Sequence, residues 1–252
     1  MKSASIQIEA GCERLLPDQP ASAWRSDPIT RALLVCGLVA PLALITFFVW
    51  ASAVTPGYSY IANSISQLAA QGQPHPEIMG AGFVVFGLLI NAFAHGLYRT
   101  LPHRESTAVW ATLSVYGTAM VLTGFFQDYA ISPKAARNVA GFAHSLFAQI
   151  AVLGLMVGIV LIARIAHQQP GWHHLTALSI VTAAAVAVTG LLFLLLPGSI
   201  QGLPQRALYL ITLIWIAGVA VTALRRRSVQ AFVNKTVPWR DSIAGDRRQG
   251  GA

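Results

Sequence analysis

The sequence predicts an all-α protein of the membrane, a polytopic bundle of six transmembrane helices. Of the 252 residues, 55% are hydrophobic and 10% are charged, whereas soluble domains carry about 25% charged residues. A helix that rises about 1.5 Å per residue needs roughly 20 apolar residues to cross a hydrocarbon core about 30 Å thick. We therefore expect one six-helix domain over residues 31–225, with no room for a soluble catalytic domain. Its spans are the uncharged apolar runs at residues 32–54, 78–98, 108–127, 139–163, 175–196 and 207–224.

The distribution of basic residues predicts that both termini are cytoplasmic. Cytoplasmic segments of membrane proteins are enriched in Lys and Arg. If the first segment is cytoplasmic, only Lys134, Arg137 and Arg206 of the 17 Lys and Arg residues fall on the opposite side. Residues 1–30 and the basic residues 226–252 then form cytoplasmic tails, and the first is expected to be disordered because it mixes both charges with prolines.

The net charge of +8 does not point to nucleic acid. The basic residues are scattered over helix ends and tails, without the interleaved aromatic residues of a nucleic-acid surface. Cys12 and Cys36 fall in a tail and in the first span, with no disulfide partner and no metal-ligand spacing. The predicted partners are therefore membrane lipids, with no nucleic acid, and no cofactor follows from the composition.

The loop before the second span predicts a small element of its own. It contains no Lys or Arg, and Ser64 to Gln67 fits a capping box, in which each side chain bonds to the other residue's backbone N–H. Ile65 and Leu68 follow at helical spacing, which predicts a short amphipathic helix at the outer interface. This helix either packs as a lid over the bundle or turns a polar side chain such as Ser66 into a cavity.

Polar residues within the spans should face the interior of the bundle, because lipid cannot satisfy their hydrogen bonds. Asn91 and His95 share one face of the second span. Ser179, Thr182 and Thr189 form a similar stripe in the fifth span. Hydrogen bonds between helices are the simplest role for all five side chains.

The hairpin between the third and fourth spans concentrates charge at the outer end of the bundle. Asp128 continues a stripe formed by Gly117 and Gly124, and small residues of this kind allow close helix approach. His144 shares a helical face with Arg137 and lies about two turns, roughly 10 Å, deeper along the axis. Asp128 and His144 are therefore expected to face inward, with Arg137 at the rim.

Three motifs, in their order and spacing, resemble the DUF998 family of bacterial and archaeal six-helix membrane proteins. They are ISQLAAQGQPHPEIMGAGFVVFGLL, GFFQD followed by GFAHSLFA, and GLPQR before the last span. The resemblance covers residues 58–224 and implies a compact bundle in the cytoplasmic (inner) membrane of a prokaryote, of unsettled biochemical role. Gln67 stands where the family commonly has an acidic residue, and Ala69 where it has glycine. The resemblance also implies that the recurrent polar or marker positions are Ser66, Leu68, Asp128, His144 and Arg206.

The first functional hypothesis is a lipid-directed hydrolase or transferase acting from the outer side. Asp128 would orient or ionise His144, His144 would act as general base, and Ser66 or a water molecule would attack. A phosphate or carbonyl oxygen of the substrate would be held by basic and amide groups nearby. The candidates for that role are Arg206, Arg137 and Gln205.

Three alternatives use the same residues. In a zinc variant of the hydrolase, His75, Asp128 and His144 would hold an ion that activates water. In a small proton-coupled transporter, Asp128 and His144 would titrate, and the polar residues of the second and fifth spans would continue the path inward. In a non-catalytic structural or assembly protein, Asp128 would pair with Arg206 or Arg137, because a charge at membrane depth needs a partner.

Overall fold

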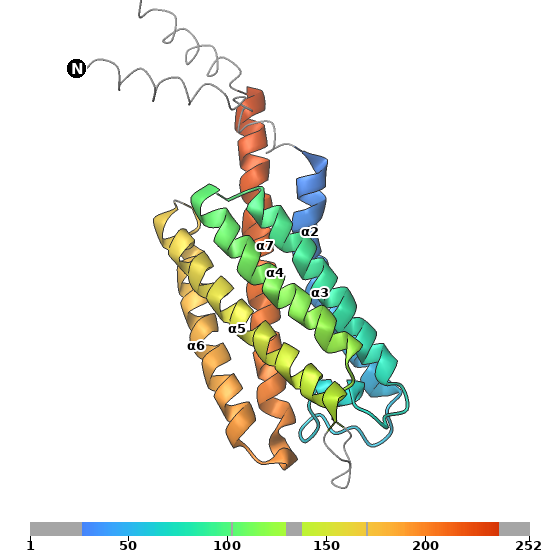
Figure 1. Cartoon of the computed structure of the whole chain (residues 1–252). Coiled ribbons are helices and arrows are strands. Elements are labelled where there is room, and N and C mark those ends of the chain that lie inside the picture. The colour runs from blue at the N-terminus through green and yellow to red at the C-terminus, as the bar shows by residue number, and fades with distance from the viewer. Residues whose placement is uncertain (1–26, 102, 130–137, 170, 237–252) are drawn as a thin grey trace, which may run out of the picture.

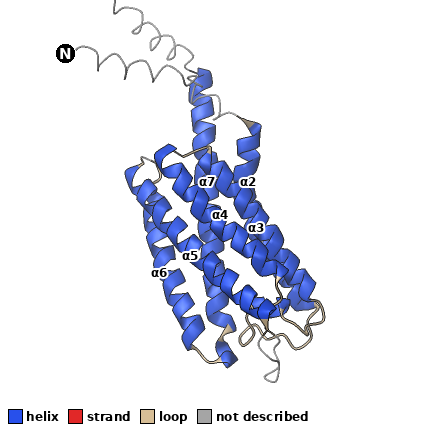
Figure 2. Ribbon diagram, viewed as in Figure 1, coloured by secondary structure: helices blue, strands red, loops and turns tan. Residues whose placement is uncertain are grey.

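The computed structural model describes residues 27–101, 103–129, 138–169 and 171–236. Six long helices run back and forth along one direction (Figure 1), and the described residues form no strand (Figure 2). The helices are α2 (Pro28–Ala53), α3 (Pro76–Tyr98), α4 (His103–Phe125), α5 (Val139–Gln168), α6 (His173–Leu195) and α7 (Gly202–Thr236), with the short 3-10 helices η2 (Ser66–Ala69) and η3 (Gly198–Ile200) in two of the connections.

The predicted all-α bundle of six spans is confirmed, since all six long helices have the length and composition to cross a membrane. Three helices extend well beyond the predicted runs: α4 begins at His103, α5 continues to Gln168 and α7 continues to Thr236. Hydropathy marks only the part of a helix that matches the hydrocarbon core, whereas backbone hydrogen bonding continues the helix into the polar zone. The terminal tails beyond residues 27–236 lie outside the described residues.

The two ends of the bundle differ in what they carry. The first residues of α2 and the last residues of α7 lie at the same end (Figure 1), which we call the terminal end. The opposite end carries the connection between α2 and α3, residues 54–75, which we call loop 1. The cytoplasmic position of the termini stays a prediction, because the arrangement of helices fixes their common end and not the side of the membrane.

The helices pack in chain order, each against the next, and α7 closes the ring by packing against α2. The α3–α4 contact depends on glycines: a Cβ built on Gly80 would lie 2.9 Å from the carbonyl oxygen of Gly124, and one built on Gly117 would lie 2.7 Å from that of Gly87. The predicted close approach of these small-residue stripes is thus confirmed. The interior is filled by large apolar side chains, among them the fully buried Phe83, Phe86 and Trp215.

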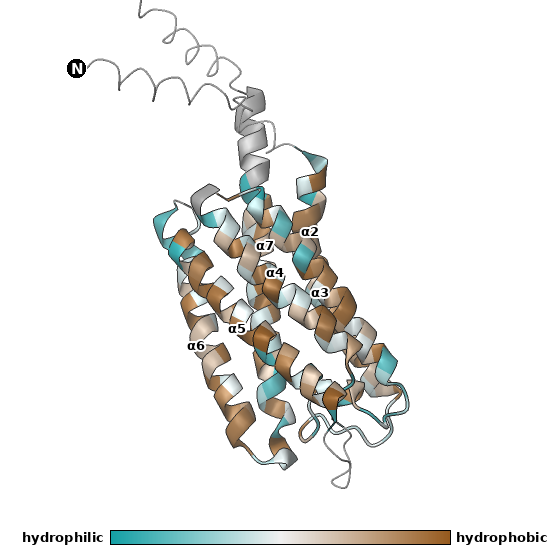
Figure 3. Ribbon diagram, in the orientation of Figure 1, coloured by the Kyte–Doolittle hydropathy of each residue, from teal (hydrophilic) through white to brown (hydrophobic). Residues whose placement is uncertain are grey.

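The outward face of the bundle is apolar along most of its length. Leu42, Leu88 and Leu153 are 65%, 57% and 66% exposed. Hydrophobic residues dominate the middle of the helices, and hydrophilic residues concentrate toward the two ends (Figure 3). Such a belt suits a hydrocarbon environment, in which exposed leucine carries no cost.

The expected bonds between helices are confirmed for Asn91 and Ser179. Thr189 is buried as predicted but donates to the Ala185 carbonyl of its own helix at 2.7 Å. Thr118 donates to Asn91 Oδ1 at 3.5 Å, which joins α4 to α3. The indole of Trp215 on α7 donates to the buried Ser179 hydroxyl on α6 at 2.9 Å. His95, in contrast, is exposed and stacks on Tyr98, because it lies one turn from the end of α3, where its ring reaches outward.

Candidate acid–base site at the loop-1 end

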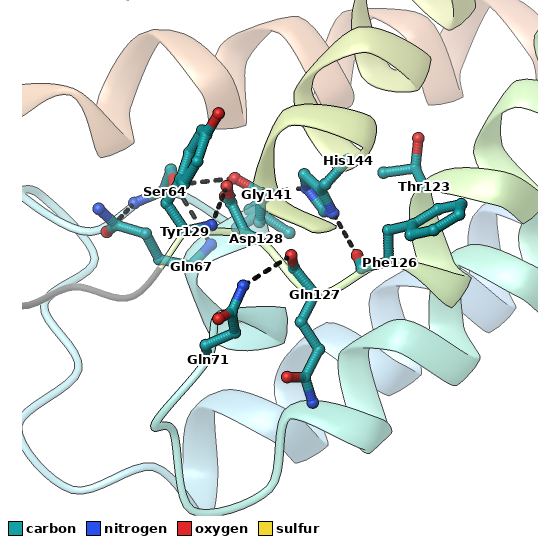
Figure 4. A network of polar contacts seen from close by, with 12 residues as sticks. Ser64, Gln67, Gln71, Thr123, Phe126, Gln127, Asp128, Tyr129, Gly141 and His144 are labelled. Carbon is teal, nitrogen blue, oxygen red and sulfur yellow. Dashed lines mark hydrogen bonds and ion pairs between the residues drawn. The ribbon is translucent and has the colours of Figure 1, made fainter. Parts of the chain in front are cut away.

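The site is centred on His144, which the fourth span places inside the bundle as predicted. Asn138 caps α5 by accepting from the Gly141 N–H at 2.9 Å, and this starts the helix six residues before His144. The His144 side chain is only 2% exposed. It lies between the backbone carbonyl of Phe126 and the carboxylate of Asp128 (Figure 4).

The two nitrogens of His144 have different partners. Nδ1 lies 2.7 Å from the Phe126 carbonyl oxygen. Because a carbonyl can only accept, Nδ1 must carry the hydrogen. Nε2 lies 3.7 Å from Asp128 Oδ2 and is buried without a hydrogen-bond partner among the described residues.

This geometry turns two hydrogen-bond acceptors toward each other. In a neutral ring with its hydrogen on Nδ1, Nε2 presents a lone pair to the Asp128 carboxylate. The two groups are suited to exchange a proton with each other or with a molecule that lies against both. The carboxylate is 16% exposed, and its other oxygen accepts from the Tyr129 N–H at 2.7 Å.

Loop 1 is fastened beside this pair by backbone bonds. The Asp128 N–H donates to the Ala69 carbonyl at 3.1 Å, and the Gln71 N–H donates to the Asp128 carbonyl at 3.1 Å, which forms a parallel bridge. Gln71 also exchanges two amide hydrogen bonds with Asn138, of 2.6 and 3.1 Å. The residue that caps α5 and the residue that faces His144 are therefore both attached to loop 1.

The predicted capping box of loop 1 is confirmed, and the predicted amphipathic helix is not. The Ser64 N–H donates to Gln67 Oε1 at 3.0 Å, and the Gln67 N–H donates to Ser64 Oγ at 3.3 Å. The box opens only the four-residue 3-10 helix η2, in which Leu68 is fully buried. Loop 1 is too firmly inserted into the bundle, and Gly72 with its φ of 84° follows too soon, for a longer helix to lie at the interface.

Among the described residues, the side chain of Gln67 makes its hydrogen bonds through the amide oxygen Oε1. That oxygen accepts from the Ser64 N–H and from the Asn63 side chain, each at 3.0 Å. A carboxylate, which the resembled family commonly has at this position, would accept the same two bonds. Glutamine in place of an acidic residue at position 67 thus keeps the capping role of this side chain.

Arg206 lies in an aromatic cage and not beside a carboxylate. Its guanidinium is 5.5 Å from the ring centres of Phe48 and Tyr58 and 5.3 Å from that of Tyr60. It donates to the Tyr58 hydroxyl at 2.6 Å and to the Asn63 carbonyl at 2.8 Å. The expected Asp128–Arg206 pair is therefore wrong, because the rings and carbonyls of loop 1 surround the cation while Asp128 faces His144.

The remaining candidate residues are distributed around loop 1. Gln205 accepts from the Ile65 N–H and approaches the Ser66 hydroxyl at 3.5 Å, so it holds η2 against α7. His75 pairs with Glu77 at 3.2 Å and is half exposed. The described residues contain no group of three potential metal ligands, so His75 does not join Asp128 and His144 there. Arg137 lies outside the described residues.

The model of the family DUF998, described as a protein of unknown function, matches residues 38–222. The chain belongs to the DUF998 family. The matched range of this DUF998 protein includes both residues of the acid–base pair and the whole of loop 1. No curated protein and no solved structure matches the chain.

Sequence reasoning missed several groups of this candidate site. The Phe126 carbonyl, which orients His144, has no side-chain signature. The Gln71–Asn138 pair joins residues 67 positions apart, and no local pattern indicates it. The cage of Arg206 did have a signal, since the sequence around Tyr58 and Tyr60 is rich in aromatic residues while the outer segments offer Arg206 few acidic partners.

Proposed function

We propose that this DUF998 protein is a membrane-embedded hydrolase or transferase that acts on a lipid or lipid-linked substrate at the loop-1 end, with Asp128 and His144 as its acid–base pair. The observation that carries the proposal is the fixed orientation of His144. Its Nδ1 is bound to a backbone carbonyl, and its Nε2 is directed at a partly exposed carboxylate. A purely structural histidine would be expected to satisfy both nitrogens.

The geometry supports different roles from those of a Ser-His-Asp triad. In such a triad the carboxylate binds Nδ1, and the nucleophile lies on the Nε2 side. Here the Phe126 carbonyl occupies Nδ1, and Asp128 stands on the Nε2 side. Ser66 is engaged with Ser64 at 3.1 Å and with Gln205, so water is the better nucleophile in this arrangement.

In the proposed reaction the pair starts as the aspartate and the imidazolium. Asp128 takes a proton from a water molecule as the water oxygen bonds to the carbonyl carbon or phosphorus of the substrate. His144 gives its Nε2 proton to the oxygen of the leaving group as that bond breaks. The proton on Asp128 then moves to His144, and the starting state is restored without a proton from solution. In a transferase, a substrate hydroxyl takes the place of water.

The surroundings of the pair favour an amphiphilic substrate. Phe125 ends α4 with 70% of its surface exposed, and Val139 and Phe142 on the first turn of α5 are 82% and 60% exposed. These apolar side chains flank the hairpin that carries Asp128 and His144. A lipid could lay its acyl chains along them with its polar bond at the level of Asp128.

The test is hydrolysis in heavy-oxygen water. We expect the purified protein, incubated with a panel of lipid esters and phosphodiesters in ¹⁸O-water, to place one ¹⁸O atom in a product. Asp128→Asn and His144→Gln should each lower the rate of ¹⁸O incorporation by a factor of about 10² or more, the usual contribution of a general acid or base. His75→Gln, at a half-exposed position away from the pair, should retain it.

Two outcomes would reject or redirect the proposal. If no lipid in the panel turns over and the lipid profile of cells is the same with wild-type protein and with Asp128→Asn at equal protein levels, the catalytic role fails. If turnover occurs without ¹⁸O in any product, the protein is a transferase. Proton-coupled uptake into proteoliposomes that is lost in both variants would support the transport alternative in place of catalysis.

A further inference from the structure

The terminal end of the bundle carries a group of arginines that the acid–base site does not use. Arg31 on α2, Arg164 on α5 and Arg225 on α7 are exposed. None of the three has an ion-pair partner among the described residues. Arg99 differs, since it bonds to Asp27 at 2.8 Å and so ties α3 to the start of α2.

A fourth arginine, Arg226, is held in place at the turn between α5 and α6. Its guanidinium lies 5.9 Å from the ring centre of Trp172, which is itself only 3% exposed. It also lies against Gly171, where the φ of 83° and the nearby Nη2 leave no space for a side chain. The turn is fixed to α7 by the hydrogen bond of 2.9 Å between His174 and Thr222.

The donors of Arg226 are free to bind a ligand. No described residue accepts a hydrogen bond from its guanidinium or forms an ion pair with it. The Trp172 ring and Gly171 hold the guanidinium in place. A guanidinium presents a planar fork of donors, which matches two oxygens of a phosphate.

The position of Arg226 favours a phosphate that is carried by a membrane lipid. Trp172 lies where α5 and α6 meet, and the ends of two spans lie at the headgroup level of a bilayer. Exposed Arg164 on α5 and Arg225 on α7 add positive charge at the same end of the bundle. A phosphate carried by a membrane lipid reaches this level without leaving the bilayer, whereas a free anion must come from water.

We propose that Arg226, stacked on Trp172 and supported by Arg164 and Arg225, binds the phosphate of an anionic phospholipid in the leaflet at the terminal end. This surface is independent of the acid–base site, which lies at the other end of the bundle. Each arginine near a membrane surface strengthens binding to anionic lipid about fivefold. The lipid would act as a bound anchor that stabilises the α5–α6 turn against α7.

The test measures the thermal midpoint of the full chain in an uncharged detergent, with phosphatidylglycerol or phosphatidylcholine of identical acyl chains added. We expect a saturable rise with phosphatidylglycerol that weakens at high salt, and no comparable rise with phosphatidylcholine. Arg226→Gln should weaken phosphatidylglycerol binding about fivefold, and the triple variant with Arg164→Gln and Arg225→Gln should remove the salt-dependent part. Arg31→Gln is the matched control: it removes the same charge on α2, away from Trp172, and should have little effect.

Four results would overturn the proposal. Equal effects of the two lipids would show that acyl chains alone stabilise the protein. An effect of Arg31→Gln as large as that of Arg226→Gln would indicate a diffuse field without a site, and an equal rise with inorganic phosphate at the same concentration would indicate a site for free anions. Arg226→Lys covers the case in which Arg226→Gln does not fold: it keeps the charge and loses the planar donors, so unchanged affinity would contradict a site built on the stacked guanidinium.

Discussion

At the scale of single residues, one backbone carbonyl decides how His144 can react. The Phe126 carbonyl binds Nδ1, which leaves Nε2 to face Asp128. Because of this contact, the two substitutions that test the site should differ in their effect on stability. Removing the imidazole leaves the carbonyl and the carboxylate without their partner, whereas changing the carboxylate to an amide supplies an N–H that can donate to Nε2.

We therefore predict that His144→Ala lowers the free energy of unfolding by roughly 1–3 kcal/mol, the cost of a buried polar group left without its partner. Asp128→Asn should change it by less than about 1 kcal/mol, because the amide can bond to a neutral His144. Chemical unfolding in detergent micelles measures both. A loss for Asp128→Asn as large as that for His144→Ala would mean that the Asp128 carboxylate contributes mainly to the stability of the fold.

Tyr58 gives the loop-1 end a dependence on alkaline pH. Burial raises the pKa of its phenol to about 12, against the opposing charge of Arg206, which lowers it. Since the folded-state pKa lies above the ordinary value of 10.0, the folded state holds this proton more tightly than the unfolded state. The corresponding stability is fully present below pH 10 and is lost as the pH rises toward 12.

We predict that Tyr58→Phe flattens this alkaline loss of stability while lowering stability at neutral pH by about 1 kcal/mol, since it removes the hydroxyl that bonds to Arg206 and to the Ser64 carbonyl. Thermal midpoints of both proteins between neutral and strongly alkaline pH measure the effect. Tyr60→Phe is the control, because it keeps the ring that faces Arg206. Parallel pH curves for wild type and Tyr58→Phe would contradict the assignment to Tyr58.

Sequence reasoning predicted part of the site because sidedness is a strong constraint. Asp128 and His144 had to lie at the same end of neighbouring spans, and their small-residue stripes directed them inward. The pairing of Asp128 with Arg206 was wrong because charge complementarity alone ignores aromatic rings and carbonyls, which surround Arg206 in the structure. Such contacts depend on how loop 1 folds back over the bundle, and no local spacing specifies that.

At the scale of elements, the α3–α4 pair is the closest packed part of the bundle. We predict that Gly124→Ala destabilises the protein by roughly 1–3 kcal/mol, because the new Cβ would lie 2.8 Å from the Val84 side chain and close to the Gly80 carbonyl. Gly190→Ala on α6 is the matched control, since nothing lies within 4 Å of its Cβ. Unfolding midpoints in micelles compare the two, and equal effects would contradict backbone contact between α3 and α4.

The junction of loop 1 with α5 can be tested as an element of its own. Gln71→Ala removes the amide pair with Asn138 and a long bond of 3.5 Å to the Gln127 carbonyl. Asn138→Ala removes the same amide pair and the helix cap. We predict losses of about 1 kcal/mol for Gln71→Ala and about 2 kcal/mol for Asn138→Ala. In a double-mutant cycle, the loss of stability in the double variant should be about 1 kcal/mol smaller than the sum of the two single losses. Full additivity would show that the two amides contribute independently.

At the scale of the whole molecule, hydropathy predicted the number and order of the spans, because the bilayer imposes one length on every helix. The start of α2 was predicted four residues late because Asp27, whose carboxylate accepts from the Ile29 N–H at 3.0 Å, begins the helix before the apolar run. The closure of the ring by α7 against α2 could not be predicted in this way. Hydropathy gives no information about which faces of distant spans meet.

The charge asymmetry of the whole bundle leads to a prediction about its orientation. Among the described residues, the terminal end holds seven arginines, at positions 31, 99, 104, 164, 225, 226 and 227, whereas the loop-1 end holds only Arg206. Because positive segments are retained on the cytoplasmic side, loop 1 and the acid–base pair should face outward. In a background with Cys12 and Cys36 replaced by serine, Glu77→Cys should react with a membrane-impermeant maleimide in intact bacterial cells. His167→Cys at the terminal end should react only after the cells are permeabilised. The reverse pattern would place the proposed site on the cytoplasmic side. Its lipid substrate would then have to come from the inner leaflet.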